Sequence, residues 1–273
     1  MSANLRVLPS PGDLTRLLAC VVARELKDGE IVAFGLHAEL MLAAALLAQK
    51  LHAPGLAIRH GLRVESGAEI GPAAWTEARE SRAHELVEYL EPHDAILDVA
   101  GTASPMRFCD VFFIGGLQID REGSTNLIGI KGKDGRMKVR GPGSIGTTSI
   151  ATLARHVMLF STDHTTRRFV ETVDYVSVPG WKRRAAVGLT GGPSLCVTPL
   201  AVFDFEDGAM RLRSVHAHAT VEEVCRRTGF TLALADEVPV TPPPSAAERA
   251  ALSVVDPFGR LDRLAIAVDG GPA

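Results

Sequence analysis

The sequence lacks an excess of basic charge, and its few cysteines lack a metal-binding pattern. Lysine and arginine total 29 against 32 aspartates and glutamates, a formal net charge of −3. Proteins that bind a phosphate backbone normally carry a basic excess, so we expect no nucleic-acid partner. The four cysteines lie far apart, without the paired spacing of a zinc site or a disulfide framework: Cys20, Cys109, Cys196 and Cys225.

A secretory leader and an uninterrupted apolar span are also missing. Residues 1–11 contain no apolar segment of the kind found in a signal peptide. The longest charge-free stretch, residues 185–203, is interrupted by glycines and prolines, and we interpret it as buried strand and loop. These absences predict a cytoplasmic protein that contacts no membrane.

The composition is that of a globular protein with a substantial core. The chain has 273 residues, of which 46% are hydrophobic and 22% charged, and this excludes intrinsic disorder. No repeat, low-complexity segment or linker divides it. We therefore predict a single domain over residues 1–273, with a β-richer part from about residue 182.

Hydrophobic periodicity predicts an α/β fold. Leucines and valines between Leu14 and Leu26 follow the spacing of one helix face, with Asp13 as the expected N-cap and Gly29 as the stop. Residues 39–51 are rich in alanine and leucine on all sides and predict a buried helix. Short apolar runs predict buried strands at 31–34, 56–62, 95–99, 111–114 and 157–160. We expect an open, mixed, mostly parallel sheet covered by helices on both faces.

The C-terminal part has a different pattern. Antiparallel strands are predicted at 195–197, 201–205 and 210–215, with Asp207-Gly208 as a hairpin turn. Residues 220–223 and 245–248 read as capping boxes, each of which begins a short helix.

Two glycine-rich segments are candidate ligand sites. Gly141 to Gly146 matches GxGxxG between a predicted strand and a predicted helix, but its position in mid-chain argues against a dinucleotide site. Backbone N–H groups at Gly141 and Gly143 could instead hold a phosphate or an oxyanion, and a plain tight turn is the alternative.

Gly115-Gly116 is the better candidate because it follows the most apolar predicted strand, where α/β sheets bind ligands. Gln118, Asp120 and Asn126 could orient a substrate there, or satisfy the backbone of their own turn.

Histidines and arginines give weaker signals. His216 and His218 share one strand face, but no third metal ligand accompanies them, so we interpret them as core or solvated histidines and expect no metal. Arg167-Arg168 could bind phosphate or form a solvated rim.

Seven segments, taken in order, resemble the β subunits of family I coenzyme A transferases, in particular the glutaconate CoA-transferase type. They lie between about Leu14 and Pro257 and are Lys27–Val32, His52–Pro54, Gly115–Asp120 with Gly123 and Asn126, Arg167–Phe169, Val173–Val176, Pro179–Trp181 and Thr228–Phe230.

The resemblance implies an open α/β fold that pairs with a homologous α subunit, often as α2β2. It implies an acyl-CoA and a small carboxylic acid as ligands, bound at the subunit interface, with no permanently bound cofactor. In these transferases a β-subunit glutamate attacks the thioester, and acyl-glutamyl and glutamyl-CoA intermediates follow in ping-pong order.

The sequence departs from this pattern at the nucleophile. Gapless spacing after Ala53-Pro54 places Gly61 where the family has its glutamate. Glu65 is the nearest carboxylate, within Val-Glu-Ser-Gly as in the glutaconate enzyme but four residues later; a shift by an even number would preserve its facing. A solvent-exposed loop acid is the alternative interpretation.

Relatives without the glutamate catalyse decarboxylation or C–C hydrolysis of acyl-CoA thioesters, and His60 is the local group suited to proton transfer because imidazole titrates near neutrality. A structural histidine is the alternative for His60. For the chain as a whole, the alternatives are a non-catalytic CoA-binding partner subunit and an NAD-dependent oxidoreductase.

Overall fold

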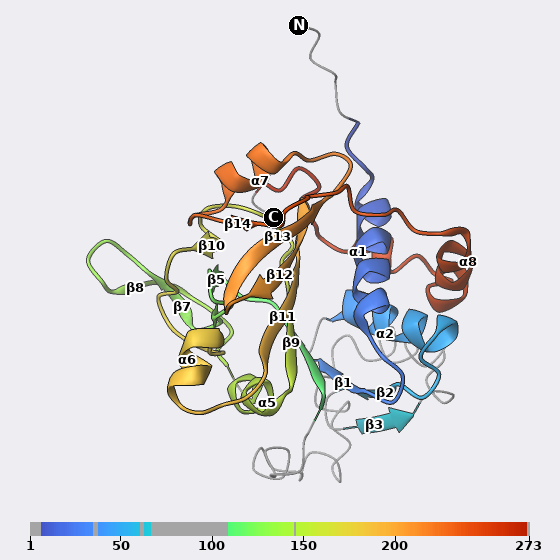
Figure 1. Cartoon of the computed structure of the whole chain (residues 1–273), viewed down its shortest axis with the longest axis horizontal. Helices are drawn as coiled ribbons and strands as arrows, with labels where there is room; N and C mark the ends of the chain where they lie inside the picture. The colour runs from blue at the N-terminus through green and yellow to red at the C-terminus, as the bar shows by residue number, and fades with distance from the viewer. Residues whose placement is uncertain (1–6, 35–37, 61–62, 67–108, 145, 272–273) are drawn as a thin grey trace, which may run out of the picture.

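One large sheet organises the chain. The computed structural model describes residues 7–34, 38–60, 63–66, 109–144 and 146–271. Nine strands are ordered β14-β13-β12-β11-β9-β4-β1-β2-β3 (Figure 1). The strands β2, β1, β4, β9 and β11 are parallel to one another, while β3 and β12 run antiparallel to their neighbours β2 and β11. The predicted mixed, mostly parallel sheet is confirmed.

The strands of this sheet coincide with the apolar runs of the sequence. The strand β1 and the strand β4 have the predicted bounds, β9 gains one residue, and residues 95–99 lie outside the described residues. The bounds are β1 (Ile31–Phe34), β2 (Ala57–His60), β3 (Arg63–Ser66), β4 (Val111–Ile114), β9 (His156–Phe160), β11 (Gly192–Val197), β12 (Ala201–Glu206), β13 (Ala209–Val215) and β14 (Ala233–Leu234).

Alternate residues of the central strands enter two separate cores. Val32 and Phe34 pack into one core, whereas Ala33 between them packs into the other. This explains the unbroken apolar runs, because a strand buried on both faces has no solvated side.

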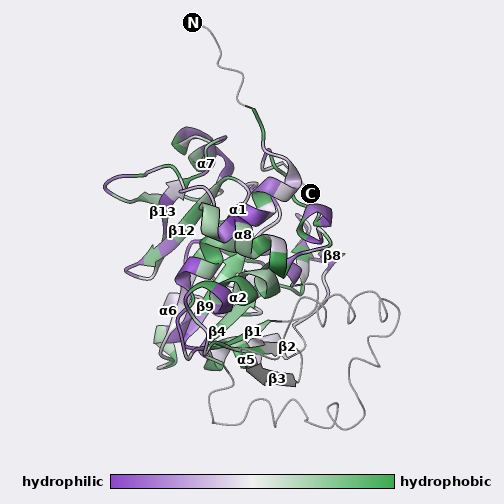
Figure 2. Ribbon diagram, turned by 90° about the vertical axis from the view of Figure 1, so that its right-hand side faces the viewer, coloured by the Kyte–Doolittle hydropathy of each residue, from purple (hydrophilic) through white to green (hydrophobic). Residues whose placement is uncertain are grey.

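Three helices cover the first face: α1 (Pro11–Glu25), α2 (Glu39–Leu51) and α8 (Ala246–Val255). Figure 2 shows them side by side in front of the sheet. The helix α2 lies in the middle and contacts both others, so most of its surface is buried, as its alanine-rich composition predicts.

The second face is covered by α5 (Thr147–Leu153), α7 (Val221–Arg227) and a three-stranded sheet ordered β10-β5-β6. The remaining elements are β5 (Gln118–Asp120), β6 (Thr125–Asn126), β7 (Gly129–Lys131), β8 (Met137–Arg140), β10 (Phe169–Val170), α6 (Trp181–Ala186) and the short 3-10 helix η1 (Leu261–Arg263).

The predicted ends of the first helix are wrong. Ser10, not Asp13, is the N-cap, and its Oγ accepts from the Asp13 N–H at 3.1 Å. Pro11 takes the first helical position, where the absence of an N–H carries no cost. The helix ends at Glu25, ahead of Gly29, which lies in the following turn with φ of 74°.

The C-terminal part follows its predictions. Asp207 and Gly208 have φ of 51° and 75° and form the hairpin turn between β12 and β13. Ser245 and Glu248 form a complete capping box, in which each side chain bonds the other's backbone N–H. Thr220 caps α7 in the same way, whereas the Glu223 carboxylate forms an ion pair with Arg227.

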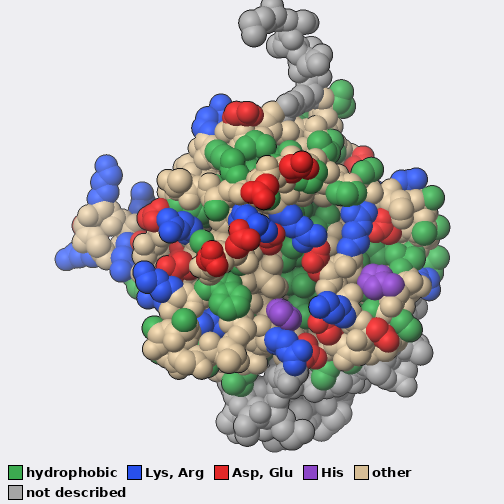
Figure 3. All heavy atoms as spheres, in the orientation of Figure 1, with side chains coloured by type: hydrophobic (Ala, Val, Ile, Leu, Met, Phe, Trp, Pro, Cys, Tyr) green, Lys and Arg blue, Asp and Glu red, His purple; other side chains and the backbone are tan. Residues whose placement is uncertain are grey.

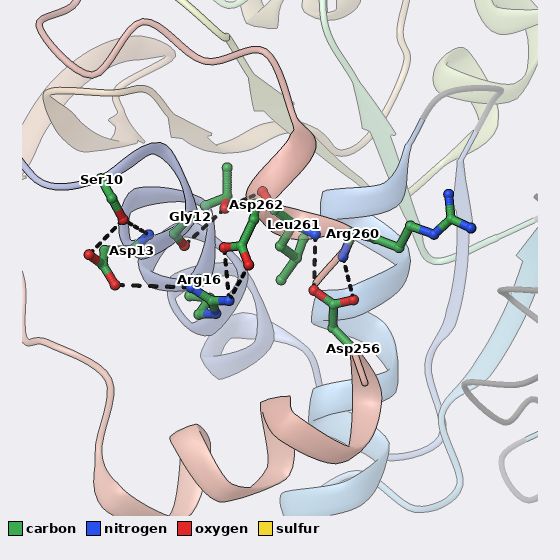
Figure 4. A network of polar contacts seen from close by, with 9 residues as sticks. Ser10, Gly12, Asp13, Arg16, Asp256, Arg260, Leu261 and Asp262 are labelled. Carbon is green, nitrogen blue, oxygen red and sulfur yellow. Dashed lines mark hydrogen bonds and ion pairs between the residues drawn. The ribbon is translucent and has the colours of Figure 1, made fainter. Parts of the chain in front are cut away.

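The segment after α8 returns across α1, and polar contacts anchor it there (Figure 4). Both carboxylate oxygens of Asp256 accept backbone N–H groups, including that of Leu261 at 2.9 Å. Thr15 of α1 donates to the Leu261 carbonyl at 2.8 Å, and Arg16 forms an ion pair with Asp262 at 2.8 Å. These contacts fix the path of the chain toward the edge of the sheet at which the parallel strands have their carboxyl ends.

Within the described part of the chain, no helix combines the length and the apolar character needed to cross a bilayer.

We predict that the Glu248 carboxylate stabilises the fold in a pH-dependent way. Its bidentate contact with Arg24, at 2.7 and 2.8 Å, lowers the pKa of Glu248 from 4.5 to about 2. Glu248→Gln keeps the cap but removes the charge, and should lower the free energy of unfolding by about 1–2 kcal/mol at pH 7.

Because the folded-state pKa is the lower one, this contribution is complete above pH 4.5 and is lost as the pH falls toward 2. Urea denaturation at pH 7 and pH 3 should show the difference between the two proteins shrinking, with exposed Glu237→Gln as control. An equal difference at both pH values would contradict the assignment.

Candidate functional site

The carboxyl ends of the parallel strands lie along one edge of the sheet, called here the carboxyl edge. The direction in which successive strands are added to the sheet switches between β1 and β4. The chain passes from β1 through α2 to β2 on one side, whereas β4 lies on the other side of β1. Such a switch point leaves a crevice at the carboxyl edge, where open α/β sheets bind ligands. Gly115 and Gly116 follow β4 directly and therefore lie at this point.

The Gly115-Gly116 turn presents unused hydrogen-bond donors. In the described chain, neither glycine N–H donates to another atom. The Gly116 carbonyl, by contrast, accepts from the guanidinium of Arg168, which also holds Asp163 through two bonds of 2.9 and 2.7 Å. The turn is thus fixed through its carbonyl, while its two N–H groups are bonded to none of the described residues.

Close approach of the backbone favours glycine at this turn. A Cβ at Gly116 would lie 3.0 Å from the Gln118 carbonyl, and one at Gly115 would lie 3.3 Å from the Phe160 carbonyl. Both distances are tight, so side chains at these positions would displace the turn.

Gln118 and Asn126 form a buried polar network behind the turn. The Asn126 amide donates to the Gln118 side-chain oxygen and to the Gly129 carbonyl, each at 2.7 Å. The Gln118 amide donates to Asp174 at 3.1 Å, and the same Gln118 oxygen accepts the Asp174 N–H at 2.9 Å. These groups bond within the chain, and the network ties three separate segments together.

Asp120 satisfies the backbone of its own turn. Its Oδ1 accepts the N–H groups of Glu122 at 3.0 Å and Ser124 at 2.8 Å. Burial raises the pKa of this carboxyl, and the two N–H bonds partly oppose the increase.

The second glycine-rich loop differs in its hydrogen bonding. The N–H groups of Gly141 and Gly143 donate to the carbonyls of Ile128 and Leu127, at 2.7 and 2.9 Å. The preceding strand, β8, pairs with β7 in a separate two-stranded sheet. The loop therefore does not follow the first strand of a dinucleotide-binding sheet, and its two N–H groups are already bonded.

The backbone of His60 lies at the same edge as the turn, and that of Glu65 lies further away. His60 is the last residue of β2 and is level with Phe34 of β1, which is level with Phe113 of β4. Two strand spacings, roughly 10 Å, separate its backbone from β4. Glu65 lies on the outermost strand, β3, opposite Ile58 and hence away from the carboxyl edge.

An apolar hollow opens near the end of β9. Its wall includes Phe160 and Ser161 from the end of β9, Leu40 from the start of α2, and Leu264 and Ile266 from the C-terminal segment. Phe160 lies between the hollow and the Gly115-Gly116 turn, because its ring and carbonyl also approach Gly115. The hollow is mostly apolar, with a few hydroxyl groups and Glu39 on its wall.

Two buried histidines near this edge are structural. His164 lies between the hydroxyls of Thr198 and Thr228, at 3.0 and 3.1 Å, and stacks on Phe169. Burial lowers the pKa of His164 to about 3 and that of His216 to about 4, so both rings are neutral at pH 7. Among the residues that the structure describes, no group of three or more acidic, histidine or cysteine side chains is placed to hold a metal ion.

Sequence reasoning missed two features of this site. The sequence predicts that Arg168 binds phosphate or forms a solvated rim, yet its guanidinium binds Asp163 and the Gly116 carbonyl. The spacing of five residues between Asp163 and Arg168 was the available signal. The contribution of Leu264 and Ile266 to the hollow carried no local signal, because it depends on the return of the C-terminal segment.

Comparison with known proteins matches this chain to coenzyme A transferases. A family model described as coenzyme A transferase matches residues 17–226. The β subunit of glutaconate CoA-transferase from Acidaminococcus fermentans is 28% identical over 88% of this chain and 91% of its own length.

Solved structures agree on the fold. The decarboxylase AibA/AibB superposes with a TM-score of 0.71 at 24% identity, over 93% of this chain and 99% of that one. Glutaconate coenzyme A-transferase from Acidaminococcus fermentans gives a TM-score of 0.66 at 26% identity, over 92% and 97%.

We predict that the Asn126 network supports folding as well as the turn. Asn126→Leu should lower the free energy of unfolding by about 2–4 kcal/mol, because it leaves the buried Gly129 carbonyl and the partly buried Ile128 N–H without partners. Chemical denaturation tests this, with exposed Arg167→Met as control. A loss no larger than that of the control would contradict the network's role.

Proposed function

Because the chain belongs to the coenzyme A transferase family, we propose that it is the β-type subunit of a heteromeric enzyme acting on a carboxylated acyl-CoA thioester. The match over residues 17–226 and the similarity to the β subunit of glutaconate CoA-transferase support this proposal. One observation carries it: at the switch point of the sheet, the two N–H groups of the Gly115-Gly116 turn have no acceptor among the residues that the structure describes.

These N–H groups are suited to bind the thioester carbonyl. Negative charge develops on that oxygen in acyl transfer and in the formation of an enolate, and fixed backbone donors stabilise it without reorganising. We assign this role to Gly115 and Gly116. Gln118 and Asn126 then position the turn through their network, and Gly141 and Gly143 position the neighbouring loop.

The hollow beside Phe160 is the proposed site for the apolar part of the acyl group. Phe160 lines the hollow and also lies close to Gly115, so a thioester at the turn places its acyl chain next to the hollow. CoA enters as part of the substrate, with no permanently bound cofactor, and a homologous α subunit completes the cleft, as the two-part name of the AibA/AibB structure suggests.

For the chemistry, we favour a reaction without a glutamyl intermediate, either decarboxylation or C–C hydrolysis of the acyl-CoA. The strand β2 ends in His60, the residue before Gly61, which gapless spacing places at the glutamate position of the transferase pattern, and Glu65 lies on the return strand. In decarboxylation the C–C bond to the carboxylate breaks, CO2 leaves, the electron pair forms the enolate held by the turn, and His60 donates a proton to the enolate carbon. In C–C hydrolysis His60 takes a proton from a water that adds to the carbonyl carbon, the C–C bond breaks to give a carboxylic acid and the enolate, and His60 returns the proton to the enolate carbon.

Transfer of CoA through Glu65 is the second candidate. The Val64-Glu65-Ser66-Gly67 sequence, which resembles that of the glutaconate enzyme, favours it. It requires a carboxylate that attacks the thioester carbon and carries the acyl group and then CoA.

We predict that His60→Asn in the assembled heteromer lowers kcat by about 10²–10³-fold, because the proton transfer loses its donor. His156→Asn, at the opposite end of the parallel strands, is the matched control and should retain turnover. Full activity of both His60→Asn and Glu65→Ala would favour a non-catalytic, CoA-binding subunit.

The two chemistries differ in covalent labelling. After incubation with acyl-CoA and reduction by borohydride, peptide mapping should find the Glu65 peptide unmodified while activity is intact. A reduced Glu65 side chain would establish transfer and rule out the favoured scheme.

A further inference from the structure

The β7–β8 hairpin concentrates positive charge on an arm that projects from the body of the protein (Figures 1 and 3). Residues 131–140 contain five cations and one acid, a formal charge of +4 in a chain whose total is −3. The cations are Lys131, Lys133, Arg136, Lys138 and Arg140, and all five residues are exposed.

Most of this charge is not neutralised within the described chain. Lys131 lies 4.7 Å from the centre of the Tyr175 ring, but the other four cations form no ion pair with described residues. Several arginines elsewhere have carboxylate partners, for example Arg24 with Glu248 and Arg211 with Asp204. Clustered cations repel one another, so a ligand with several negative charges is favoured here.

The hairpin also has an apolar face. Ile130 pairs with Val139, and Met137 lies two residues before Val139 on the same strand, whereas Lys138 and Arg140 alternate to the other side. Met137 and Val139 are 40% and 44% exposed. The apolar pair and the cations Lys138 and Arg140 therefore lie on opposite faces of β8, and an occupant meets both an apolar surface and cations where it reaches the tip, at Lys133 and Arg136.

The base of the arm is attached to the candidate thioester site. Asn126 bonds Gly129 at the start of β7, and its own carbonyl accepts the N–H of Leu117, the residue after the Gly115-Gly116 turn. From this base the hairpin extends about five residues, roughly 16 Å, to its tip.

We propose that this arm binds the adenosine 3′-phosphate 5′-diphosphate end of the substrate's CoA. This inference rests on the proposed function, since the pantetheine chain separates the thioester from three phosphate groups and an adenine. With the thioester at the turn, the arm offers the tip cations Lys133 and Arg136 to the phosphates and the Met137–Val139 face to the base. The phosphates bind by charge, so binding weakens as ionic strength rises.

The test compares two double variants of the assembled heteromer that change net charge equally. Lys133→Glu with Arg136→Glu alters the arm, and Lys50→Glu with Arg249→Glu alters exposed positions on α2 and α8. Each is assayed with an acyl-CoA and with the matching acyl-pantetheine, which lacks the phosphates and adenine.

We expect the arm variant to raise KM for acyl-CoA about tenfold or more with kcat little changed. KM for acyl-pantetheine should stay within twofold, and the control variant should behave as wild type. Calorimetry with adenosine 3′,5′-bisphosphate should show binding to wild type and its loss in the arm variant.

Equal KM values for wild type and arm variant, or equal effects on both thioesters, would overturn the proposal. Loss of co-elution with the α subunit in the arm variant alone would also overturn it, and would identify the arm as a subunit contact. If wild type binds the bisphosphate through the arm but converts neither thioester, the proposed function fails while the arm's ligand stands.

Discussion

The hydrogen bonds of Asn126 are the constraint on which the site depends. This fully buried amide joins the Gln118 side chain, the start of the β7–β8 hairpin and the loop that precedes it. A buried amide is stabilising only when its partners are all in place, so these segments have one relative arrangement. The Gly115-Gly116 turn adjoins these segments and takes its position from them, and Arg168 holds the turn by donating to the Gly116 carbonyl.

Local patterns in the sequence predict much of the fold and less of the site. The strands at residues 31–34 and 111–114 and the helix at 39–51 have their predicted bounds, because burial on both sides leaves unbroken apolar runs. The prediction for the first helix cap is wrong because Ser10 and Asp13 are both good caps, and Pro11 decides between them. The contact of Gln118 with Asp174 spans 56 residues, and no local spacing encodes it.

The two glycine-rich segments show that local sequence also does not reveal which backbone donors are available to a ligand. Both are candidates for binding an anion through backbone N–H groups, and the sequence favours Gly115-Gly116 on its position after an apolar strand. The structure distinguishes them by hydrogen bonding: the donors of Gly141 and Gly143 are bonded to carbonyls, and those of Gly115 and Gly116 have no acceptor within the described chain. Glycine content shows where the backbone can be approached, and only the fold shows which donors remain.

The anchored C-terminal segment allows the shape of the hollow to change separately from the structure of the sheet. Its wall of the hollow lies beyond residue 226, where the match to the family ends, and it is attached to α1 through Thr15 and Arg16, with Leu264 and Ile266 packed against the first core. Side chains at 264–266 therefore shape the hollow from a segment that contributes no strand to the sheet and no residue to the glycine turn or the arm. Under the proposed function, substitutions in this segment would change which acyl group fits the hollow while the strands of the sheet stay the same.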